Sequence, residues 1–383
     1  MHRGQREIRP TRAEIDLPAV CDNAATLAAI AGADLYAVVK ADAYGHGAVP
    51  VAAALQRSGH VAGFAVSLVE EGVALREAGI DGPILVMGPA LAGGHDALID
   101  FDLTAILSDP GDLEHLADAA RRRDVQVAAH IKFDTGMGRL GIGPRERERV
   151  LARARSLPSL AITGLSTHFA CADDDDPEDP GCLTAVQLER FDRAVADARR
   201  IGLTPRVLHT ANSAATLRFP AARKDLVRCG LALHGNGPGP SGSTAGPLQP
   251  VMRLVTHVVQ IRTVEPGSTV SYGALWRASR ASRLAVIPIG YADGVPRQVT
   301  GKARVLIAGQ RYPVVGAVSM DICVVDVTDS TSPVDVGDEV VLLGSQGEER
   351  ITAREYASWA DCTEYEVTCG VSRRVPRRYS QER

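Results

Sequence analysis

A lysine at the end of an apolar run is the first residue of this chain whose type and place could do chemistry. Lys40 lies in "AVVKADAYGHG", and the chain contains only three other lysines, which are Lys132, Lys224 and Lys302. A lysine in such a place can be a surface charge, a point charge that binds phosphate, or an amine nucleophile that forms a Schiff base. The surrounding residues must decide between these three interpretations.

Small and hydroxyl-bearing residues follow Lys40 and two later apolar runs. Tyr44 and two glycines come soon after Lys40, and the stretches "HTANSAAT" and "VRCGLALHG" contain Ser213 and Gly230. Glycines, hydroxyls and backbone amides of this kind suit the close approach of a phosphate group. A lysine that faces several such loops favours pyridoxal phosphate, because its aldehyde condenses with an amine and its phosphate needs a cradle.

Eight short β-type runs must position these residues. Helical periodicity separates many of the runs, and strands that alternate with helices form right-handed βαβ units with a parallel sheet. Eight such units close into a (β/α)8 barrel of about 250 residues, whose active-site residues lie at the carboxyl ends of the strands. An open doubly wound sheet is the alternative. The predicted strands span residues 35–40, 63–67, 83–88, 103–108, 125–133, 160–169, 206–210 and 226–235.

The end of the barrel is predicted from a change of pattern. The stretch "NGPGPSGSTAGP" (236–247) is rich in Gly, Pro and Ser and indicates a linker. Beyond it, β-type runs separated by turn residues replace the helical alternation, with one helical stretch, "AREYASWA". We therefore expect an α/β fold, a (β/α)8 TIM-type barrel over residues 1–246 followed by a mostly β domain over residues 247–383.

The composition of the whole chain excludes several classes of protein. The 383 residues carry a formal net charge of -4, which gives no indication of nucleic acid or an anionic membrane as a partner. No apolar run approaches the roughly 20 residues that span a bilayer, and the charged N-terminus lacks the apolar core of a signal peptide. Seven cysteines without a CxxC pair indicate reduced thiols, so we expect a cytoplasmic protein without a zinc site.

Nine stretches, taken in order, resemble the alanine racemase family of pyridoxal-phosphate barrel enzymes. The resemblance covers nearly the whole chain and implies a homodimer that interconverts L- and D-alanine, which supplies D-alanine for peptidoglycan. It implies that Lys40 forms the Schiff base with the cofactor. The stretches are "AVVKADAYGHG", "KFDTGMGRLG", "STHFA", "HTANSAA", "VRCGLALHG", "VSYGALW", "GYADGVPR", "GAVSMD" and "YEVTCGVSRRVPR".

The resemblance also assigns residues around the cofactor. Arg228 would face the pyridine nitrogen, with His168 close to it. Because a guanidinium only donates hydrogen bonds, it suits an unprotonated ring nitrogen. This weakens the ring as an electron sink and favours proton exchange at the α-carbon over transamination. The residues placed around the phosphate are Tyr44, Ser213, Gly230, Leu231 and Tyr365.

Racemisation needs a second proton-transfer group across the ring from Lys40, and the resemblance assigns Tyr272 of "VSYGALW". It places Tyr272 in the active site of the partner subunit, so each site would be shared between two chains. A tyrosine has an ordinary pKa near 10, which nearby positive charge must lower for work at neutral pH. Tyr291, Met320 and Asp321 would come from the same partner to contact the substrate carboxylate and shape the entrance.

Lys132 and Arg139 lie in the same stretch, "KFDTGMGRLG". Arg139 would bind the phenolic oxygen of the cofactor and the substrate carboxylate. In the family this lysine can be carbamylated, and the resulting anion holds the arginine in place. An ordinary pair between Lys132 and Asp134 is the alternative.

Two features depart from the usual pattern of the family. His234 in "LHG" stands where "LYG" is common, and residues 173–179 form an unusually acidic loop. The loop lacks the ordered ligand spacing of a calcium site, so we expect a solvated entrance loop without a metal. The resemblance implies that Asp173 takes the gate position of the family. These departures leave serine or a broader range of amino acids open as substrates.

Two other functions use the same barrel. A barrel decarboxylase usually brings a substrate-side cysteine motif from its β domain, and the cysteines in "DCTEY" and "CGVSRR" do not lie in that context. A non-catalytic carrier of pyridoxal phosphate would lack both the β domain and Tyr272.

Overall fold

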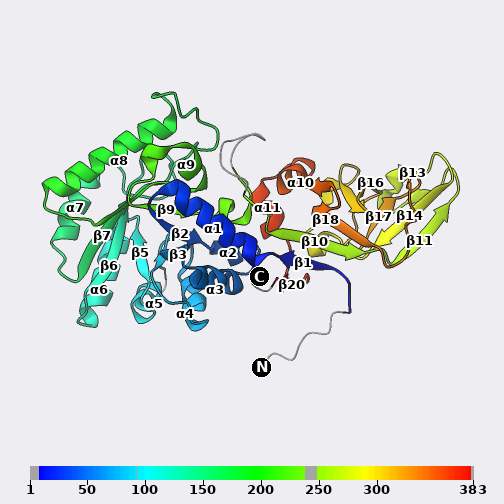
Figure 1. The fold of residues 1–383 in the computed structure, drawn as a ribbon. Coiled ribbons are helices and arrows are strands. Elements are labelled where there is room, and N and C mark those ends of the chain that lie inside the picture. Colours follow the sequence, from blue (N-terminus) through cyan, green and yellow to red (C-terminus); the bar gives the residue numbers. More distant parts are fainter. Residues whose placement is uncertain (1–7, 92, 238–247, 381–383) are drawn as a thin grey trace. The chain divides into compact units, whose positions relative to one another are not determined.

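The computed structural model describes residues 8–91, 93–237 and 248–380, and Figure 1 shows its fold. Its contacts divide the chain into two compact units. The barrel unit runs from Ala19 to Gln249, and the β unit joins the residues up to Pro18 to the segment that starts at Pro250.

Eight parallel strands form the sheet of the barrel unit, and they confirm the predicted strands and fold class. Their spatial order is β8-β7-β6-β5-β4-β3-β2-β9. Backbone hydrogen bonds from Asp225 N to Leu208 O (3.1 Å) and from Arg228 N to Ala211 O (3.0 Å) connect the two ends of this order and nearly close the barrel. The strands are β2 (Asp34–Val38), β3 (Gly63–Val66), β4 (Ile84–Val86), β5 (Thr104–Leu107), β6 (Val127–Lys132), β7 (Leu160–Ser166), β8 (Val207–His209) and β9 (Leu226–Cys229).

Helices follow most of the barrel strands, and α6 (Pro110–Arg122) shows how such a helix buries an apolar face. In α6, Leu113, Leu116, Ala117 and Ala120 are buried, at the spacing of one helix face. None of the helices in the described ranges is long and apolar enough to cross a membrane. The other helices of this part of the chain are α1 (Leu17–Ala31), α2 (Lys40–Tyr44), α3 (Ala48–Ser58), α4 (Val69–Glu77), α5 (Gly94–Asp100), α7 (Arg147–Arg155), α8 (Leu183–Arg200) and α9 (Ser213–Arg218), with the 3-10 turns η1 (Pro220–Ala222) and η2 (Leu231–His234).

A ten-stranded sheet dominates the β unit, with β19 beside β18 and the order β11-β14-β17-β16-β15-β18-β10-β1-β20 for the rest. Its strands are β1 (Arg12–Ile15), β10 (Met252–His257), β11 (Gln260–Val264), β14 (Ser282–Ile287), β15 (Arg304–Ile307), β16 (Gln310–Val315), β17 (Cys323–Asp326), β18 (Glu339–Gln346), β19 (Glu349–Ile351) and β20 (Arg377–Tyr379). A two-stranded ribbon, β12 (Thr269–Val270) and β13 (Trp276–Arg277), and three 3-10 turns, η3 (Tyr272–Ala274), η4 (Tyr291–Asp293) and η5 (Arg297–Val299), complete the strand-rich part.

The β unit contains two α-helices among its described residues. The predicted helix "AREYASWA" is α10 (Ala353–Ala360), and α11 (Glu364–Cys369) was not predicted. Six residues are too short to show helical periodicity. A capping box of Thr363 and Glu366 was the available signal for this helix.

The first strand of the chain belongs to the β unit, which differs from the predicted assignment of residues 1–246 to the barrel. In β1, Ala13 lies opposite Leu254 of β10 and opposite Arg377 of β20. Ala13 and Ile15 are buried in the β unit. The sequence did not show this assignment, because the strands that pair with β1 are far from it along the chain. The predicted boundary at residues 246 and 247 lies outside the described residues, as does most of the predicted linker.

Candidate active site

Lys40 begins α2, which is a turn of left-handed helix. Ala41, Asp42, Ala43 and Tyr44 have φ angles of 51, 55, 51 and 54°. For residues other than glycine, this conformation costs roughly 1–2 kcal/mol each. The surrounding structure must therefore hold the turn in place, as is common at functional sites.

Two carboxylates hold this turn. Glu71 of α4 accepts a hydrogen bond from Ala41 N (2.6 Å), and Asp42 accepts one from Ala48 N (2.7 Å) at the start of α3. The first bond satisfies an N–H group of the left-handed turn, and the second ties the turn to the first N–H group of α3. The result is a fixed place for Lys40 just past the carboxyl end of β2.

The predicted phosphate cradle is assembled beyond the carboxyl ends of β8 and β9. Ser213 Oγ accepts hydrogen bonds from Gly230 N (3.0 Å) and Ala232 N (3.3 Å). Tyr44 lies against the same backbone, since a Cβ on Gly230 would overlap the Tyr44 hydroxyl. Leu231 follows as the first residue of η2. The structure thus brings together four residues that were predicted to bind phosphate, and their hydroxyls and amides suit that group.

Arg228 is buried on β9 and its guanidinium is surrounded by acceptors. It donates to His209 Nδ1 (2.7 Å), Thr167 O (2.9 Å) and Thr210 O (3.2 Å), and His168 Nδ1 lies 3.3 Å away. Burial lowers the pKa of Arg228 to about 10, so the group stays charged at neutral pH. Burial and then the Arg228 charge hold the pKa of His168 well below its ordinary value.

Two buried histidines continue inward from Arg228. Because Arg228 donates to His209 Nδ1, neutral His209 carries its proton on Nε2, which lies 2.9 Å from His130 Nδ1. Burial, followed by the charge of Arg228, lowers the pKa of His130 to about 4. The His130 ring fits because β7 has Gly164 beside it, where a Cβ would lie 2.6 Å from the ring. Neither histidine was predicted as a site residue, although His130 lies two positions before Lys132 on the same face of its strand.

Lys132 is buried at the end of β6, with 9% of its surface exposed. Burial, followed by the charges of Arg228 and Arg139, lowers the pKa of Lys132 to about 8, and the Asp134 charge opposes this shift. The Asp134 carboxylate accepts hydrogen bonds from the backbone amides of residues 136–138. This carboxylate therefore holds its own loop, which leads to the exposed Arg139.

Several predicted site residues lie close enough to His168 for their charges to change its pKa. The charges of Arg228, Lys132, Arg139 and Lys40 all lower the pKa of His168. The site is therefore strongly cationic, as expected for a place that binds anionic groups.

The remaining predicted residues lie on the β unit, beginning with Tyr272. It is the first residue of η3, and its side chain is 73% exposed. The hydroxyl of Ser271 donates to Ala317 O (2.7 Å), which fixes η3 beside the loop that carries Met320. Tyr365 lies on α11 and is also exposed.

Two turns of the β unit carry Tyr291, Met320 and Asp321. Tyr291 N donates to Ser319 O and the next amide donates to Met320 O, both over 3.0 Å. A Cβ on Gly290 would overlap the carbonyl groups of residues 319 and 320, so glycine lets the two turns touch. We call the exposed apolar residues of this region the apolar cluster: Tyr272, Leu275, Tyr291, Met320 and Ile322.

The two departures from the family pattern also have clear positions. His234 stacks on His46, with ring centres 4.0 Å apart, and its ring centre lies 5.4 Å from that of Tyr44, so it packs beside Tyr44. In the acidic loop, Asp173 is exposed and its carbonyl accepts a hydrogen bond from Arg218 (2.5 Å). Among the described residues, no group of three or more His, Cys, Asp or Glu side chains is placed to hold a metal ion.

Comparisons with known protein families agree with this geometry. Residues 15–238 match the model of the alanine racemase N-terminal domain, and residues 251–379 match that of the alanine racemase C-terminal domain. The chain belongs to the alanine racemase family. This confirms the predicted resemblance, and it favours neither the decarboxylase nor the carrier alternative.

Individual alanine racemases resemble the chain over its full length. The alanine racemase of Sorangium cellulosum (strain So ce56) is 44% identical over 386 residues, which cover 98% of this chain and 100% of that protein. The crystal structure of alanine racemase from D-cycloserine producing Streptomyces lavendulae has a TM-score of 0.92 and 37% identity, with 99% of this chain and 98% of that one covered. The alanine racemase of Bacillus anthracis, solved with bound L-Ala-P, has a TM-score of 0.89 and 33% identity, with 98% and 96% covered.

Proposed function

We propose that the protein racemises alanine with pyridoxal phosphate as its cofactor. The observation that carries this proposal is the buried Arg228 close to the cradle of Tyr44, Ser213 and Gly230. The family assignment supports the reaction, and the racemase solved with bound L-Ala-P supports alanine as the amino acid.

The residues of the barrel unit fit this cofactor. When bound, pyridoxal phosphate withdraws electrons from the α-carbon of an attached amino acid and so makes its α-proton acidic. Lys40 supplies the amine for covalent attachment, and Tyr44 and Ser213 supply hydroxyls for the phosphate. Gly230 leaves room for the Tyr44 hydroxyl, which a Cβ at that position would overlap, and so keeps this hydroxyl beside the backbone amides of the cradle. Tyr365 would add a further hydroxyl, and Leu231 a backbone amide.

Arg228 directs the reaction toward racemisation. Its guanidinium has five donors and no acceptor, and its pKa of about 10 keeps it protonated at neutral pH. We place it at the ring nitrogen, to which it can donate a hydrogen bond but not a proton. Negative charge then stays closer to the α-carbon, which favours return of a proton to that carbon. His209 and Thr167 keep the guanidinium in place.

Proton transfer on the two faces of the α-carbon needs two groups. We assign Lys40 to one face and Tyr272 to the other. Tyr272 is exposed within the apolar cluster, and this exposed apolar surface supports a homodimer in which a second copy of the chain covers the cluster and shares the active sites. In this arrangement Tyr291, Met320 and Asp321 approach the substrate carboxylate from the partner subunit, and Arg139 approaches it from the barrel.

We also propose that Lys132 is carbamylated. Its pKa of about 8 leaves a fraction of roughly one tenth as the neutral amine at pH 7. The neutral nitrogen attacks carbon dioxide, a nitrogen–carbon bond forms, and the ammonium proton is lost to solvent. The resulting anion would offset the surrounding charges of Arg228, Arg139 and Lys40 and would hold Arg139 for the substrate.

A cellular role follows from the reaction. We propose that the D-alanine serves peptidoglycan synthesis and that the enzyme works in the cytoplasm. An odd number of cysteines without a CxxC pair supports a reducing compartment.

A chiral amino-acid assay tests the proposed function. Purified protein with pyridoxal phosphate is incubated with L-alanine, D-alanine, L-serine and other L-amino acids, and the enantiomers are separated by chromatography. We expect alanine from either direction to reach an equal mixture, and faster than serine. Release of carbon dioxide without inversion would identify a decarboxylase instead, and faster turnover of serine would change the substrate.

A further inference from the structure

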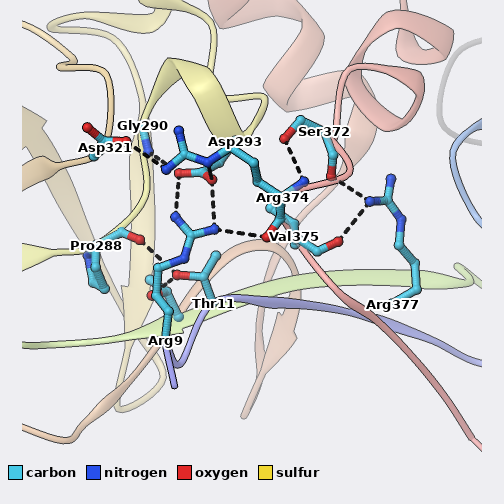
Figure 2. Close-up of polar contacts among 11 residues, drawn as sticks. Arg9, Thr11, Pro288, Gly290, Asp293, Asp321, Ser372, Arg374, Val375 and Arg377 are labelled. Carbon is cyan, nitrogen blue, oxygen red and sulfur yellow. Dashed lines mark hydrogen bonds and ion pairs between the residues drawn. The ribbon is translucent and has the colours of Figure 1, made fainter. Parts of the chain in front are cut away.

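Asp293 is a fully buried carboxylate of the β unit that two arginines approach (Figure 2). Arg9, from the segment before β1, donates to both carboxylate oxygens over 2.9 and 2.7 Å. Gly290 N donates to Oδ2 (3.1 Å), and Arg374 Nε lies 3.5 Å from Oδ1. A buried carboxylate destabilises a fold unless it is paired and hydrogen-bonded. These contacts therefore fix the η4 turn, which carries Tyr291.

Arg374 extends from this buried carboxylate to Asp321. Its NH2 group donates to Asp321 Oδ1 (2.7 Å), and both of these side chains are about half exposed. Asp321 directly follows Met320. One guanidinium thus connects the turn that carries Met320 with the turn that carries Tyr291, in addition to the backbone bonds between them.

The backbone that carries Arg374 is itself fixed, as Figure 2 shows. Ser372 Oγ accepts from Arg374 N (3.2 Å), and Arg9 donates to Arg374 O (3.2 Å). Arg377 donates to the carbonyl oxygens of Ser372 (2.6 Å) and Val375 (2.8 Å). The guanidinium of Arg374 is therefore presented from a tightly bonded segment, which suits a positioning role.

We propose that Arg374 is a positioning residue that aligns the turns of Tyr291 and Met320 for the substrate, acting through Asp321 and Asp293. The inference rests on the proposed function, which gives these turns their contact with the substrate. Arg374 also compensates the negative charge of Asp321, which would otherwise repel the carboxylate of alanine. Because Asp293 keeps Arg9 and Gly290 N as partners, the fold does not depend on Arg374 alone.

The experiment compares Arg374→Ala and Arg374→Lys with Arg373→Ala. Arg373→Ala is the matched control, because Arg373 is the adjacent arginine, is exposed, and its replacement removes the same charge. In Arg374→Ala we expect KM for alanine to rise about tenfold in both directions while kcat changes less than about twofold, the pattern expected when contacts that bind the substrate and the transition state equally are weakened. Arg374→Lys should recover part of the KM, since one ammonium can reach one carboxylate but not both. Cofactor absorbance and the thermal midpoint should match wild type.

A double-mutant cycle with Asp321→Asn separates positioning from a general effect of charge. If Arg374 acts through Asp321, then Arg374→Ala should change KM far less in the Asp321→Asn background than in wild type. Additive effects, or an Arg374→Ala enzyme identical to Arg373→Ala, would overturn the proposed role. Arg374→Gln replaces Arg374→Ala if the latter loses its cofactor absorbance or thermal transition. Absence of alanine racemisation by the wild-type enzyme would instead refute the proposed function.

Discussion

Arg228 donates a hydrogen bond to His209 Nδ1 over 2.7 Å, and this fixes the proton of His209 on the nitrogen that faces His130. The three side chains form one buried row from β9 through β8 to β6. Arg228 donates to His209, and His209 donates to His130. Protonation of either histidine would place a donor where the row needs an acceptor. The row therefore requires both histidines to be neutral, and this requirement has a consequence for stability in acid.

We expect the free energy of unfolding to fall in acid because of His130. The pKa of His130 is about 4 in the folded protein, compared with an ordinary value of 6.5. Between these values the unfolded chain binds more protons, so stability is lost as the pH falls from 6.5 to 4, by about 3 kcal/mol over the whole window. Urea midpoints at pH 7.5 and pH 5 should differ less for His130→Gln than for wild type.

The control for this measurement is His60→Gln, because His60 is exposed. Its urea midpoints should keep the pH dependence of wild type. An unchanged pH dependence in His130→Gln would remove His130 as the source of the effect.

Lys40→Ala should abolish both covalent attachment of the cofactor and racemisation. The wild-type protein should be yellow, and borohydride reduction should attach the cofactor to the peptide that contains Lys40, as mass spectrometry can show. The exposed Lys302 offers a matched control, and Lys302→Ala should keep the colour, the labelled peptide and the activity. A colourless wild-type protein with full activity would refute the assignment of Lys40.

Mixed subunits should regain activity if the active sites are shared. Lys40→Ala and Tyr272→Phe chains should each be nearly inactive alone, because every turnover needs both groups. After subunit exchange, a heterodimer contains one site with both groups intact, so activity should approach about a quarter of the wild-type value at equal mixing, because half of the dimers are mixed and each has one active site of two. Exchange that is demonstrated by differently tagged chains but restores no activity would exclude the shared site.

Tyr272→Phe should distinguish the proton-transfer groups on the two faces of the α-carbon. We expect Lys40 to take the α-proton of D-alanine and Tyr272 that of L-alanine, since the cofactor holds the substrate with one group on each side. In deuterium oxide the variant should still exchange the α-proton of D-alanine but hardly that of L-alanine, as NMR can measure. If exchange is retained equally for both enantiomers, one group serves both faces and Tyr272 is not a catalytic residue.

Lys132 should bind carbon dioxide as a carbamate. Protein prepared in ¹³C-labelled bicarbonate should show a carbamate signal in its carbon NMR spectrum, and Lys132→Ala should lack it. Because the reaction needs the neutral amine, occupancy should rise with pH through the pKa of about 8. Lys132→Ala should also raise KM for alanine through misplacement of Arg139, while Lys302→Ala should change neither the spectrum nor KM.

The barrel and its polar strand ends could be predicted because they depend on local pattern. Short apolar runs, helical periods and glycine-rich turns follow one another along the chain, so Lys40, Ser213 and Arg228 could be assigned to a common face. The spacing of two between His130 and Lys132 indicated the face of His130 but not whether its ring would fit among the neighbouring strands, so His130 was missed. Its fit depends on the glycine at position 164 of the neighbouring strand.

Contacts between distant segments could not be predicted. Arg9 and Asp293 are 284 residues apart, and an arginine in a charged N-terminal segment looks like any solvated cation. The left-handed turn after Lys40 was equally hidden, because Ala41 and Ala43 ordinarily favour a right-handed helix. In both cases tertiary hydrogen bonds override the local preference.

The pairing of β1 with β20 sets the order in which the chain can fold during synthesis. Residues 12–15 leave the ribosome before the barrel strands, yet one of their two partner strands, residues 377–379, emerges after them. The barrel strands emerge in between and can form their sheet first. Until residues 377–379 have emerged, one edge of β1 is unpaired, and another nascent chain could pair with it. The unit that carries Tyr272 is completed only when translation has passed residue 379.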